Sequence, residues 1–383
     1  MKYWDRIVHF HERGYKDFPT GEEGLRAVKF LRSFFEKMGF ESLPSDHPLR
    51  NRLGAGYEPN YLWLVQYGKK IQKASHFSGF EHIAKRLINP KEYLAAHNEI
   101  EVALKLSLEG LNVSFLSADS QHAPDLILRL DNDITRIEVS SLNPPEEETR
   151  FRMFLDPIIH LSFSRGVVSG GYVNKLPSPK KMKELVVQVK ESIDRSKEEK
   201  KVEKLNFKGV ATIYIAPIDL VDQIPADCRG SFHFVGPRKR KPIEYQIQQK
   251  IEKKSRQLFG DNESGLLFLY TLMIGKEEVL NLFKNDMDDI VAILASYPKL
   301  LGLVLTVPHN EIRVVSGINL AKLKHEYKEN KIFLECEAGK YQYESIVIWK
   351  NLHSEGNFPE EIFRALKNYS SNLSNLEPLQ LNK

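Results

Sequence analysis

The sequence lacks several features that would assign it to a class of protein at once. Only two of its 383 residues are cysteines, Cys228 and Cys336, too few and too far apart for a zinc site built from thiolates. No apolar run approaches the roughly 20 residues that a membrane-spanning helix needs. The first eighteen residues are charged throughout and lack the apolar stretch of a signal peptide. These absences predict a cytoplasmic protein with two reduced thiols and no membrane partner.

A strong excess of charge is also missing. The 55 Lys and Arg residues are nearly balanced by 51 Asp and Glu, so the net charge is only +4. Positive charge is concentrated in RKRKPIEYQIQQKIEKKSR, residues 238–256, where eight Lys or Arg residues stand against two Glu. Such a segment is typical of a surface that contacts phosphate groups, and a solvated helix face has the same composition. The nucleic-acid-binding candidates here are Arg238, Lys239, Arg240, Lys241, Lys253 and Arg256.

The length and the 42% content of hydrophobic residues predict a globular protein with a substantial core. Residues 1–90 are predicted to be a mostly helical region. Residues 91–318 are predicted to form an α/β core, a mixed sheet flanked by helices, which a charged helical insertion interrupts near residues 144–207. Residues 319–383 are predicted to be a C-terminal extension with a polar, frayed tail.

The α/β core begins with the pattern of one helix and three strands. Residues 92–110 carry apolar side chains at helical spacing, and Gly110 ends the pattern. NVSFL, DLILRL and TRIEVSSL then predict strands, and DND between the last two predicts a hairpin turn. Further along, the basic segment should become helical after Pro242, and GLLFLYTLMI predicts a buried strand.

Other segments predict elements with less bearing on function. A long charged helix is expected in SPKKMKELVVQVKESIDRSKEEKKVEKL, and strands are expected in GVATIYIAP, IRVVSG and YESIVIWKNL. DDIVAILASYPKLLGLVLTVP predicts a helix and then a strand. SGGY, residues 169–172, is glycine-rich without the lysine of a phosphate-binding loop and predicts a turn.

Two carboxylates stand out because a hairpin would bring them together. Asp125 lies at the start of one predicted strand, and Glu138 lies within the next, so both can reach the same end of a sheet. Paired carboxylates suit Mg²⁺, a hard cation that prefers oxygen ligands. A third carboxylate is expected from the preceding helix, where Glu99 is preferred and Glu101 is the alternative; acidic residues near a helix start also occur for electrostatic reasons alone.

These segments resemble the PD-(D/E)xK superfamily, whose members have the restriction-endonuclease-like fold. The matching residues are NEIEVALKLSLEGLNVSFL, Pro124 with Asp125, and IEVSS at residues 137–141. IEYQIQQKIEKKSRQL and GLLFLYTLMI resemble the later core helix and strand, and that helix matches a family pattern through Lys250, Lys254, Gln257 and Leu258. The resemblance covers roughly residues 92–142 and 243–275.

Ser140 departs from the family pattern, because family members carry a lysine at this position. That lysine orients or activates the attacking water and stabilises negative charge, whereas a serine hydroxyl is uncharged and a poor base. One explanation is that the cation has moved to the later helix, where Lys250 and Lys254 lie one turn apart on the same face. The other is that the site is inactive and the fold serves to bind.

The resemblance implies a metal-dependent nuclease that hydrolyses phosphodiester bonds in DNA or RNA. Its Mg²⁺ or Mn²⁺ would be held by Glu99, Asp125 and Glu138, and these three residues would act with Lys250 and Lys254 in catalysis. The alternative is a catalytically inactive module on the same fold that binds nucleic acid or a partner. A third alternative is an unrelated α/β protein in which the two carboxylates are surface residues of a hairpin. The nuclease-like interpretation fails if Asp125 and Glu138 do not converge. A homodimer is compatible with either nuclease-like alternative.

Overall fold

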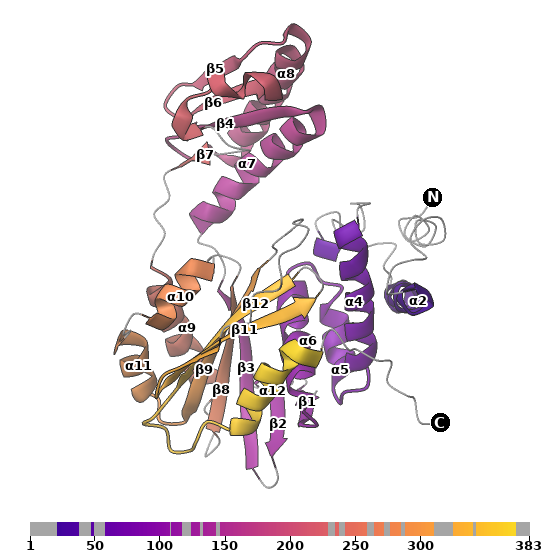
Figure 1. Cartoon of the computed structure of the whole chain (residues 1–383), viewed down its shortest axis with the longest axis vertical. Coiled ribbons are helices and arrows are strands. Elements are labelled where there is room, and N and C mark those ends of the chain that lie inside the picture. The colour runs from indigo at the N-terminus through magenta and orange to yellow at the C-terminus, as the bar shows by residue number, and fades with distance from the viewer. Residues whose placement is uncertain are drawn as a thin grey trace. The chain divides into compact units, whose positions relative to one another are not determined.

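The computed structural model describes fourteen ranges of the chain. These are residues 21–37, 47–49, 58–107, 109–116, 124–130, 133–142, 146–228, 234–236, 242–258, 264–271, 276–284, 288–309, 325–339 and 342–372. The chain forms two compact units, each described by itself below (Figure 1). The first unit combines Met1–Leu142 with Glu244–Lys383, and the second consists of Asn143–Ile243.

The first unit is built on a mixed sheet in the order β1-β2-β3-β8-β9-β12-β11-β10. Strands β3, β8 and β9 run parallel in its middle, and antiparallel strands complete both sides. The strands are β1 (Asn112–Phe115), β2 (Leu126–Leu130), β3 (Asp133–Leu142), β8 (Ser264–Thr271), β9 (Leu300–His309), β10 (His325–Tyr327), β11 (Lys331–Gly339) and β12 (Gln342–Lys350).

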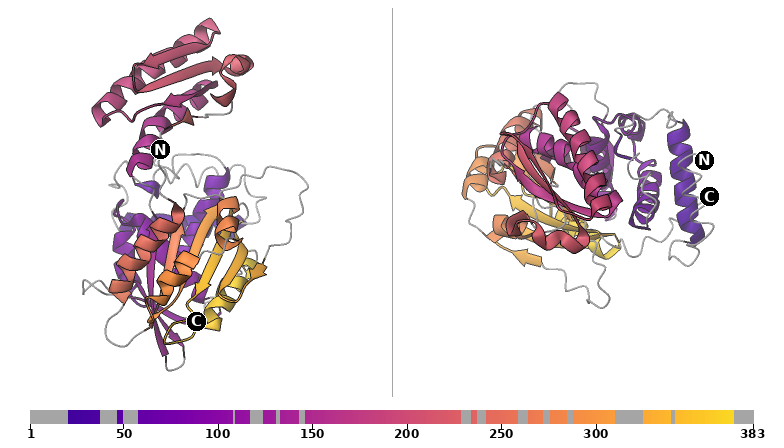
Figure 2. Two further views of the ribbon diagram at one scale, coloured as in Figure 1. Left: turned by 90° about the vertical axis from the view of Figure 1, so that its left-hand side faces the viewer. Right: turned by 90° about the horizontal axis from the view of Figure 1, so that it is seen from above.

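Helices flank this sheet, as Figures 1 and 2 show. The helices of the first unit are α2 (Gly21–Lys37), α4 (Glu58–Ala74), α5 (Phe80–Arg86), α6 (Tyr93–Ser107), α9 (Ile243–Leu258), α10 (Lys276–Lys284), α11 (Asp288–Ala295) and α12 (Glu360–Asn372). The coarse prediction of an α/β fold with a mixed sheet flanked by helices is therefore confirmed. Within the described residues, every helix is too short or too polar to cross a membrane.

The middle strands are apolar on both faces because helices cover both sides of a parallel sheet. Residues 266–270 of β8 are all less than 5% exposed. On one face, Leu266 and Phe268 share a core with Ile100 and Ala103 of α6 and with Ile362 of α12. The same core includes buried residues of α2, α4 and α5, so the N-terminal helices belong to the first unit.

The second unit has its own sheet in the order β5-β6-β4-β7. Helices α7 and α8 pack on this sheet and bury a separate apolar core that includes Phe154, Leu185, Val189, Ile213 and Ile215. The elements are α7 (Glu146–Arg165), β4 (Val167–Val173), α8 (Pro179–Glu199), β5 (Glu203–Phe207), β6 (Ala211–Pro217), the short 3-10 helices η2 (Ile218–Gln223) and η3 (Ala226–Cys228), and β7 (Phe234–Val235).

The boundaries of these units differ from the predicted ones. The insertion does not end near residue 207 but continues to Ile243, because β6 and β7 complete its sheet. A boundary at residue 318 would cut through the main sheet, since β11 and β12 lie beside β9. A boundary at residue 90 would cut through the core that α4 and α5 share with α6.

Two local predictions were wrong or incomplete. SGGY is not a turn but part of β4, where Gly171 has a positive φ of 156° and a Cβ would come within 2.1 Å of the Thr212 carbonyl oxygen. The helical insertion predicted near residues 144–207 was given no separate helix after NPP, where α7 runs for 20 residues and accommodates Pro157. The predicted strand IRVVSG lies outside the described residues. The first five residues of the predicted frayed tail, 368–372, are instead the end of α12, and the remainder of the tail lies outside the described residues.

Candidate functional site

The hairpin of β2 and β3 brings Asp125 and Glu138 together. The two strands pair antiparallel with Leu126 opposite Ile137, which places Asp125 beside Glu138 at the start of β2. One carboxylate oxygen of Asp125 accepts a hydrogen bond of 2.8 Å from the backbone N–H of Val139. The convergence of Asp125 and Glu138 that the sequence predicted is therefore present.

Glu99 joins these carboxylates from α6. This helix packs on β1 and β3, and Asn98 donates a hydrogen bond of 2.9 Å from its side-chain amide to the Ser141 hydroxyl. Glu99 is only 1% exposed, and Arg86 donates to both of its carboxylate oxygens at 2.6 and 2.7 Å. Arg86 is the last residue of α5, so a fourth element contributes a charge to the site.

The carboxylates influence one another electrostatically. Burial raises the pKa of Glu99 to about 8, with a further rise from the negative charge of Asp125, while Arg86 opposes both effects. Burial and Asp125 likewise raise the pKa of Glu138 to about 7 against the attraction of Lys254. Burial also raises the pKa of Asp125. Carboxylates that resist ionisation together form a site where added positive charge would be favourable.

Helix α9 brings two lysines to the same place. Lys254 forms an ion pair with Glu138, and the Lys250 ammonium group donates a hydrogen bond of 3.1 Å to the Ser140 hydroxyl. The two lysines therefore reach β3 from 116 and 110 residues along the chain. Burial lowers the pKa of Lys250, and the neighbouring charges of Lys254 and Lys253 lower it further. Lys250 thus places a cation directly at the position where the family pattern has a lysine.

Glu101, the alternative third carboxylate, belongs to a different cluster. It accepts hydrogen bonds of 2.7 and 2.9 Å from Lys70 and lies 3.7 Å from His97. Burial would raise its pKa, but Lys70, His97 and Lys105 outweigh that effect and lower it to about 2. Two residues further along α6 than Glu99, its side chain leaves the helix in a different direction, so the prediction of Glu101 as an alternative ligand was wrong.

The predicted nucleic-acid contacts are only partly described. Lys253 is an exposed residue of α9. Arg256 also lies in α9, and its side chain is not among those described. Arg238, Lys239, Arg240 and Lys241 lie outside the described residues.

Arg86 is the site residue that the sequence did not indicate. It lies thirteen residues before Glu99, near the end of a helix in a segment whose residues match no motif. Arg86 and its neighbour Lys85 are both basic residues in the last turn of α5, where cations are common for electrostatic reasons. Only the packing of α5 against α6 distinguishes Arg86 from an ordinary surface arginine.

Two of the three carboxylates are suited to hold a metal ion. Asp125 and Glu138 offer hard oxygen donors of the kind that Mg²⁺ or Mn²⁺ prefers. Glu99 does not fit as a third ligand, since both of its oxygens are bonded to Arg86. In agreement with this, the described part of the chain contains no group of three or more His, Cys, Asp or Glu side chains arranged to hold a metal ion.

The site as a whole combines half-buried Asp125, directly before β2, with the buried carboxylates of Glu99 and Glu138, the Ser140 hydroxyl and two lysines of α9. Such a combination can bind a cation through the carboxylates and an anionic group through the lysines. No protein family model, no curated protein and no solved structure matches this chain. A functional assignment therefore depends on the chemistry of these side chains.

Proposed function

We propose that this chain is a metal-dependent nuclease-like protein that hydrolyses phosphodiester bonds in DNA or RNA. The observation that carries the proposal is the meeting of Asp125 and Glu138 with Lys250 and Lys254. The order α6, β1, β2, β3, α9 and β8 in the first unit supports a restriction-endonuclease-like fold, because it is similar to the core of the PD-(D/E)xK superfamily.

Asp125 and Glu138 are the residues that would hold Mg²⁺ or Mn²⁺ in this proposal. A bound divalent ion polarises a phosphodiester and lowers the pKa of an attacking water molecule. The backbone N–H of Val139 fixes the carboxylate of Asp125, and Lys254 fixes that of Glu138, so both are held in place before an ion binds. Preorganised ligands of this kind lose little conformational entropy on binding.

Lys250 takes the role of the lysine that Ser140 replaces. Its ammonium group lies at the Ser140 hydroxyl, where it can stabilise the negative charge that develops on a phosphate. Because burial lowers its pKa, Lys250 also loses its proton more readily than an exposed lysine. In its neutral form it is suited to act as a general base that accepts a proton from water. Lys254 stays bonded to Glu138 and acts on the orientation of that carboxylate.

The second unit carries the net excess of positive charge that would attract a nucleic acid. Residues 143–243 contain 19 Lys and Arg against 13 Asp and Glu, whereas the rest of the chain contains 36 against 38. The net charge of +4 therefore arises from the inserted unit, and the unit that carries the site is slightly acidic. This distribution supports substrate binding by the insertion through phosphate contacts.

A catalytically inactive binding module is the second candidate. Two observations favour it: Ser140 stands in place of the expected lysine, and both oxygens of Glu99 are bonded to Arg86. Such a module would bind nucleic acid through the same positive charge but would leave the phosphodiester bonds intact.

The test is a cleavage assay with end-labelled DNA and RNA in Mg²⁺, Mn²⁺ or EDTA. We expect cleavage that requires the metal and falls at least about a hundredfold in Asp125→Asn and Glu138→Gln, because each removes a charged ligand. The control Asp133→Asn, an exposed carboxylate on β3, should cleave normally. On α9, Lys250→Met should reduce cleavage about a hundredfold while exposed Lys253→Met changes it less than threefold.

The outcomes separate the candidates. Binding of nucleic acid without cleavage under every metal condition would establish the inactive module. Absence of both binding and cleavage would contradict the proposal altogether. Equal losses in Lys250→Met and Lys253→Met would show that α9 acts only through its total charge.

A further inference from the structure

The Arg86–Glu99 pair has the geometry of a fixed structural interaction. The two terminal nitrogens of Arg86 bond separately to the two oxygens of Glu99, at 2.6 and 2.7 Å. Arginine and carboxylate groups form such two-pronged pairs with more strength and directional preference than a lysine pair provides. The side chain of Glu99 is 1% exposed and that of Arg86 is 21% exposed, so water competes little with the pair.

Helix α5 holds Arg86 where it is. Phe80 and Ile83 of this helix are buried in the main core, and the carbonyl of Leu87, directly after Arg86, accepts a hydrogen bond of 2.9 Å from the ring of His47. Pulling Glu99 away from Arg86 would leave a half-buried arginine without its partner, which is costly. A metal ion would therefore have to compete with Arg86 for each oxygen of Glu99.

The charges of the site point to a single divalent ion. Three carboxylates, Glu99, Asp125 and Glu138, face two paired cations, Arg86 and Lys254. Within the described residues no ion pair involves Asp125, which accepts the Val139 N–H and shares a side-chain hydrogen bond with Glu138. These groups leave one uncompensated negative charge, and one divalent ion more than neutralises it. A second divalent ion would be repelled by the positive charges of Arg86, Lys254 and the nearby Lys250.

We infer that the site takes one divalent cation, held by Asp125 and Glu138, and that Arg86 replaces a second cation by occupying Glu99. Arg86 is then a positioning residue, and Glu99 is not a metal ligand, unlike in the three-carboxylate set that the family resemblance implies. This inference rests on the proposed function, because it concerns the metal of that same site.

The experiment counts Mn²⁺ ions per chain by electron paramagnetic resonance, which detects free Mn²⁺ during a titration without any substrate. We expect one ion per wild-type chain. Glu99→Gln should bind one ion with a Kd within threefold of wild type, whereas Asp125→Asn and Glu138→Gln should bind at least tenfold more weakly. Arg86→Met should bind a second ion at pH 8.5, because Glu99 is then available.

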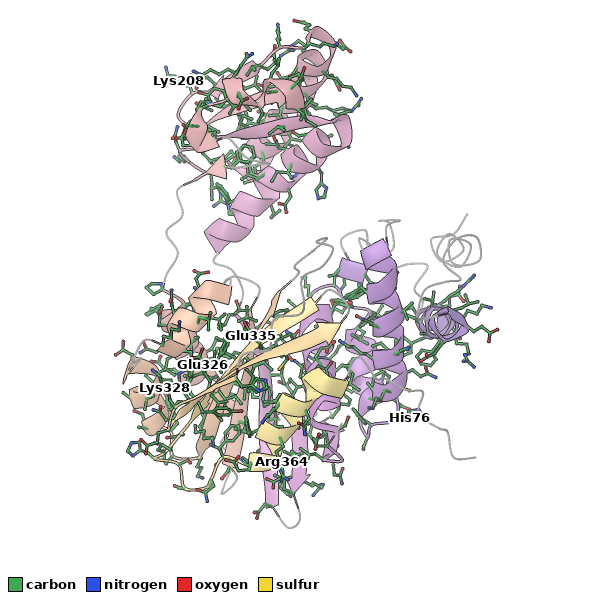
Figure 3. All side chains as sticks on the ribbon, viewed as in Figure 1. His76, Lys208, Glu326, Lys328, Glu335 and Arg364 are labelled. Carbon is green, nitrogen blue, oxygen red and sulfur yellow. The ribbon has the colours of Figure 1, made fainter. Side chains whose placement is uncertain are left out.

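Two further variants keep the result interpretable. Arg86→Met with Glu99→Gln removes both charges of the pair, avoids a buried unpaired group and should return the chain to one ion. Arg364→Met is the matched control. The side chain of Arg364 on α12, labelled in Figure 3, is 61% exposed, and among the described residues its ion pair is with Glu361 in the same helix. This variant should bind one ion with unchanged affinity.

Each result bears on a distinct claim. Two ions in the wild type, a tenfold loss in Glu99→Gln, or one ion in folded Arg86→Met would overturn the inference and leave the metal-dependent function standing. If Arg86→Met does not fold, the double variant decides, since a tenfold loss of affinity there would make Glu99 a ligand. No Mn²⁺ binding by the wild type would overturn the metal requirement of the proposed function, and the inference with it.

Discussion

Ser140 and Lys250 show at the scale of single residues how a charge can be supplied from a distant part of the chain. Ser140 provides a hydroxyl at the end of the hairpin, and Lys250 places its ammonium group 3.1 Å from that hydroxyl. What a phosphate would meet is a positive charge near two carboxylates, whichever segment encodes it. The absence of a lysine from the strand therefore does not by itself argue against nuclease chemistry.

The raised pKa values of the carboxylates predict how stability depends on pH. The pKa of Glu138 is about 7 in the folded chain against an ordinary value of 4.5. Between these values the folded state keeps a proton that the unfolded state has lost, so stability is greatest at low pH and falls as pH rises through 7. We expect a loss of roughly 2 kcal/mol between pH 5 and pH 8 in EDTA. Urea unfolding at four pH values measures it.

The variant Glu138→Gln removes this contribution and should make the pH profile shallower than that of wild type, while Glu99, whose pKa is about 8, keeps its own contribution. Asp133→Asn, exposed on the same strand, should leave the profile unchanged. Stability that rises over this interval, or an equally steep profile in Glu138→Gln, would contradict the assignment of the effect to Glu138.

Sequence reasoning located some site residues and missed others for physical reasons. Asp125 and Glu138 could be predicted because strand alternation and a short hairpin fix their positions relative to each other. Lys250 and Lys254 could be proposed because they lie one helical turn apart. Arg86 could not, because its contact with Glu99 depends on how α5 packs on α6, and no local pattern encodes that packing.

At the scale of elements, α6 serves two sites with neighbouring residues. Asn98 and Glu99 face Ser141 and Arg86, whereas Glu101 and Lys105 face a second cluster. In that cluster buried Lys105 forms an ion pair with Glu344 of β12 and donates a 3.2 Å hydrogen bond to the Tyr270 hydroxyl of β8. The helix that presents Glu99 is thus tied to strands on both sides of the sheet's centre.

A glycine fixes the start of α5 and hence the position of Arg86. Gly79 has a φ of +80°, and an added Cβ would lie 2.1 Å from the carbonyl oxygen of Phe115. We expect Gly79→Ala to lower the free energy of unfolding by more than about 2 kcal/mol, since left-handed strain alone costs 1–2 kcal/mol. Gly110→Ala is the control, because Gly110 has a φ of +75° with open space around it and should lose only the strain.

Urea unfolding of the two variants gives the comparison. The difference between them isolates the clash with Phe115 from the cost of the left-handed conformation. Equal losses would show that the backbone near Phe115 relaxes and that α5 is not held by close approach at Gly79.

Helices and strands could be predicted where the spacing of apolar residues followed a single period. The apolar run of β8 and the helical spacing of α6 both appear in the structure close to where the sequence put them. The strand β4 was missed because adjacent glycines suggest a turn, although here they let strands approach closely. Helix α7 was not given bounds within the predicted helical insertion because Pro157 weakens the helical pattern.

At the scale of the whole molecule, the chain separates a slightly acidic unit that carries the site from a basic inserted unit. The sequence predicted an insertion but ended it too early, because the short β7 and the strand β6 have no local signal that assigns them to one sheet or the other. Strand partners are set by tertiary contacts, and these also join residues 325–350 to the main sheet.

The inserted unit should fold by itself because it has its own core. We expect residues 143–243 expressed alone to unfold cooperatively on heating. In that fragment Val189→Ala should lower stability by about 2 kcal/mol, since Val189 is fully buried. Val187→Ala on the same helix should change it by less than about 0.5 kcal/mol, since Val187 is 56% exposed.

Circular dichroism at 222 nm follows both melts. A broad, non-cooperative melt of the wild-type fragment would show that the insertion depends on the first unit. Equal effects of the two alanine variants would show that the core of the fragment differs from that of the full chain.

The pairing of β3 with β8 has a consequence for the order in which a ribosome makes the site. Glu138 leaves the ribosome 116 residues before Lys254, about 6 to 23 seconds earlier at ordinary synthesis rates. During that interval the whole inserted unit is made, while β3 still lacks its parallel neighbour β8. The carboxylates thus precede their lysine partners, and the nascent chain completes a basic unit before it can complete its acidic site.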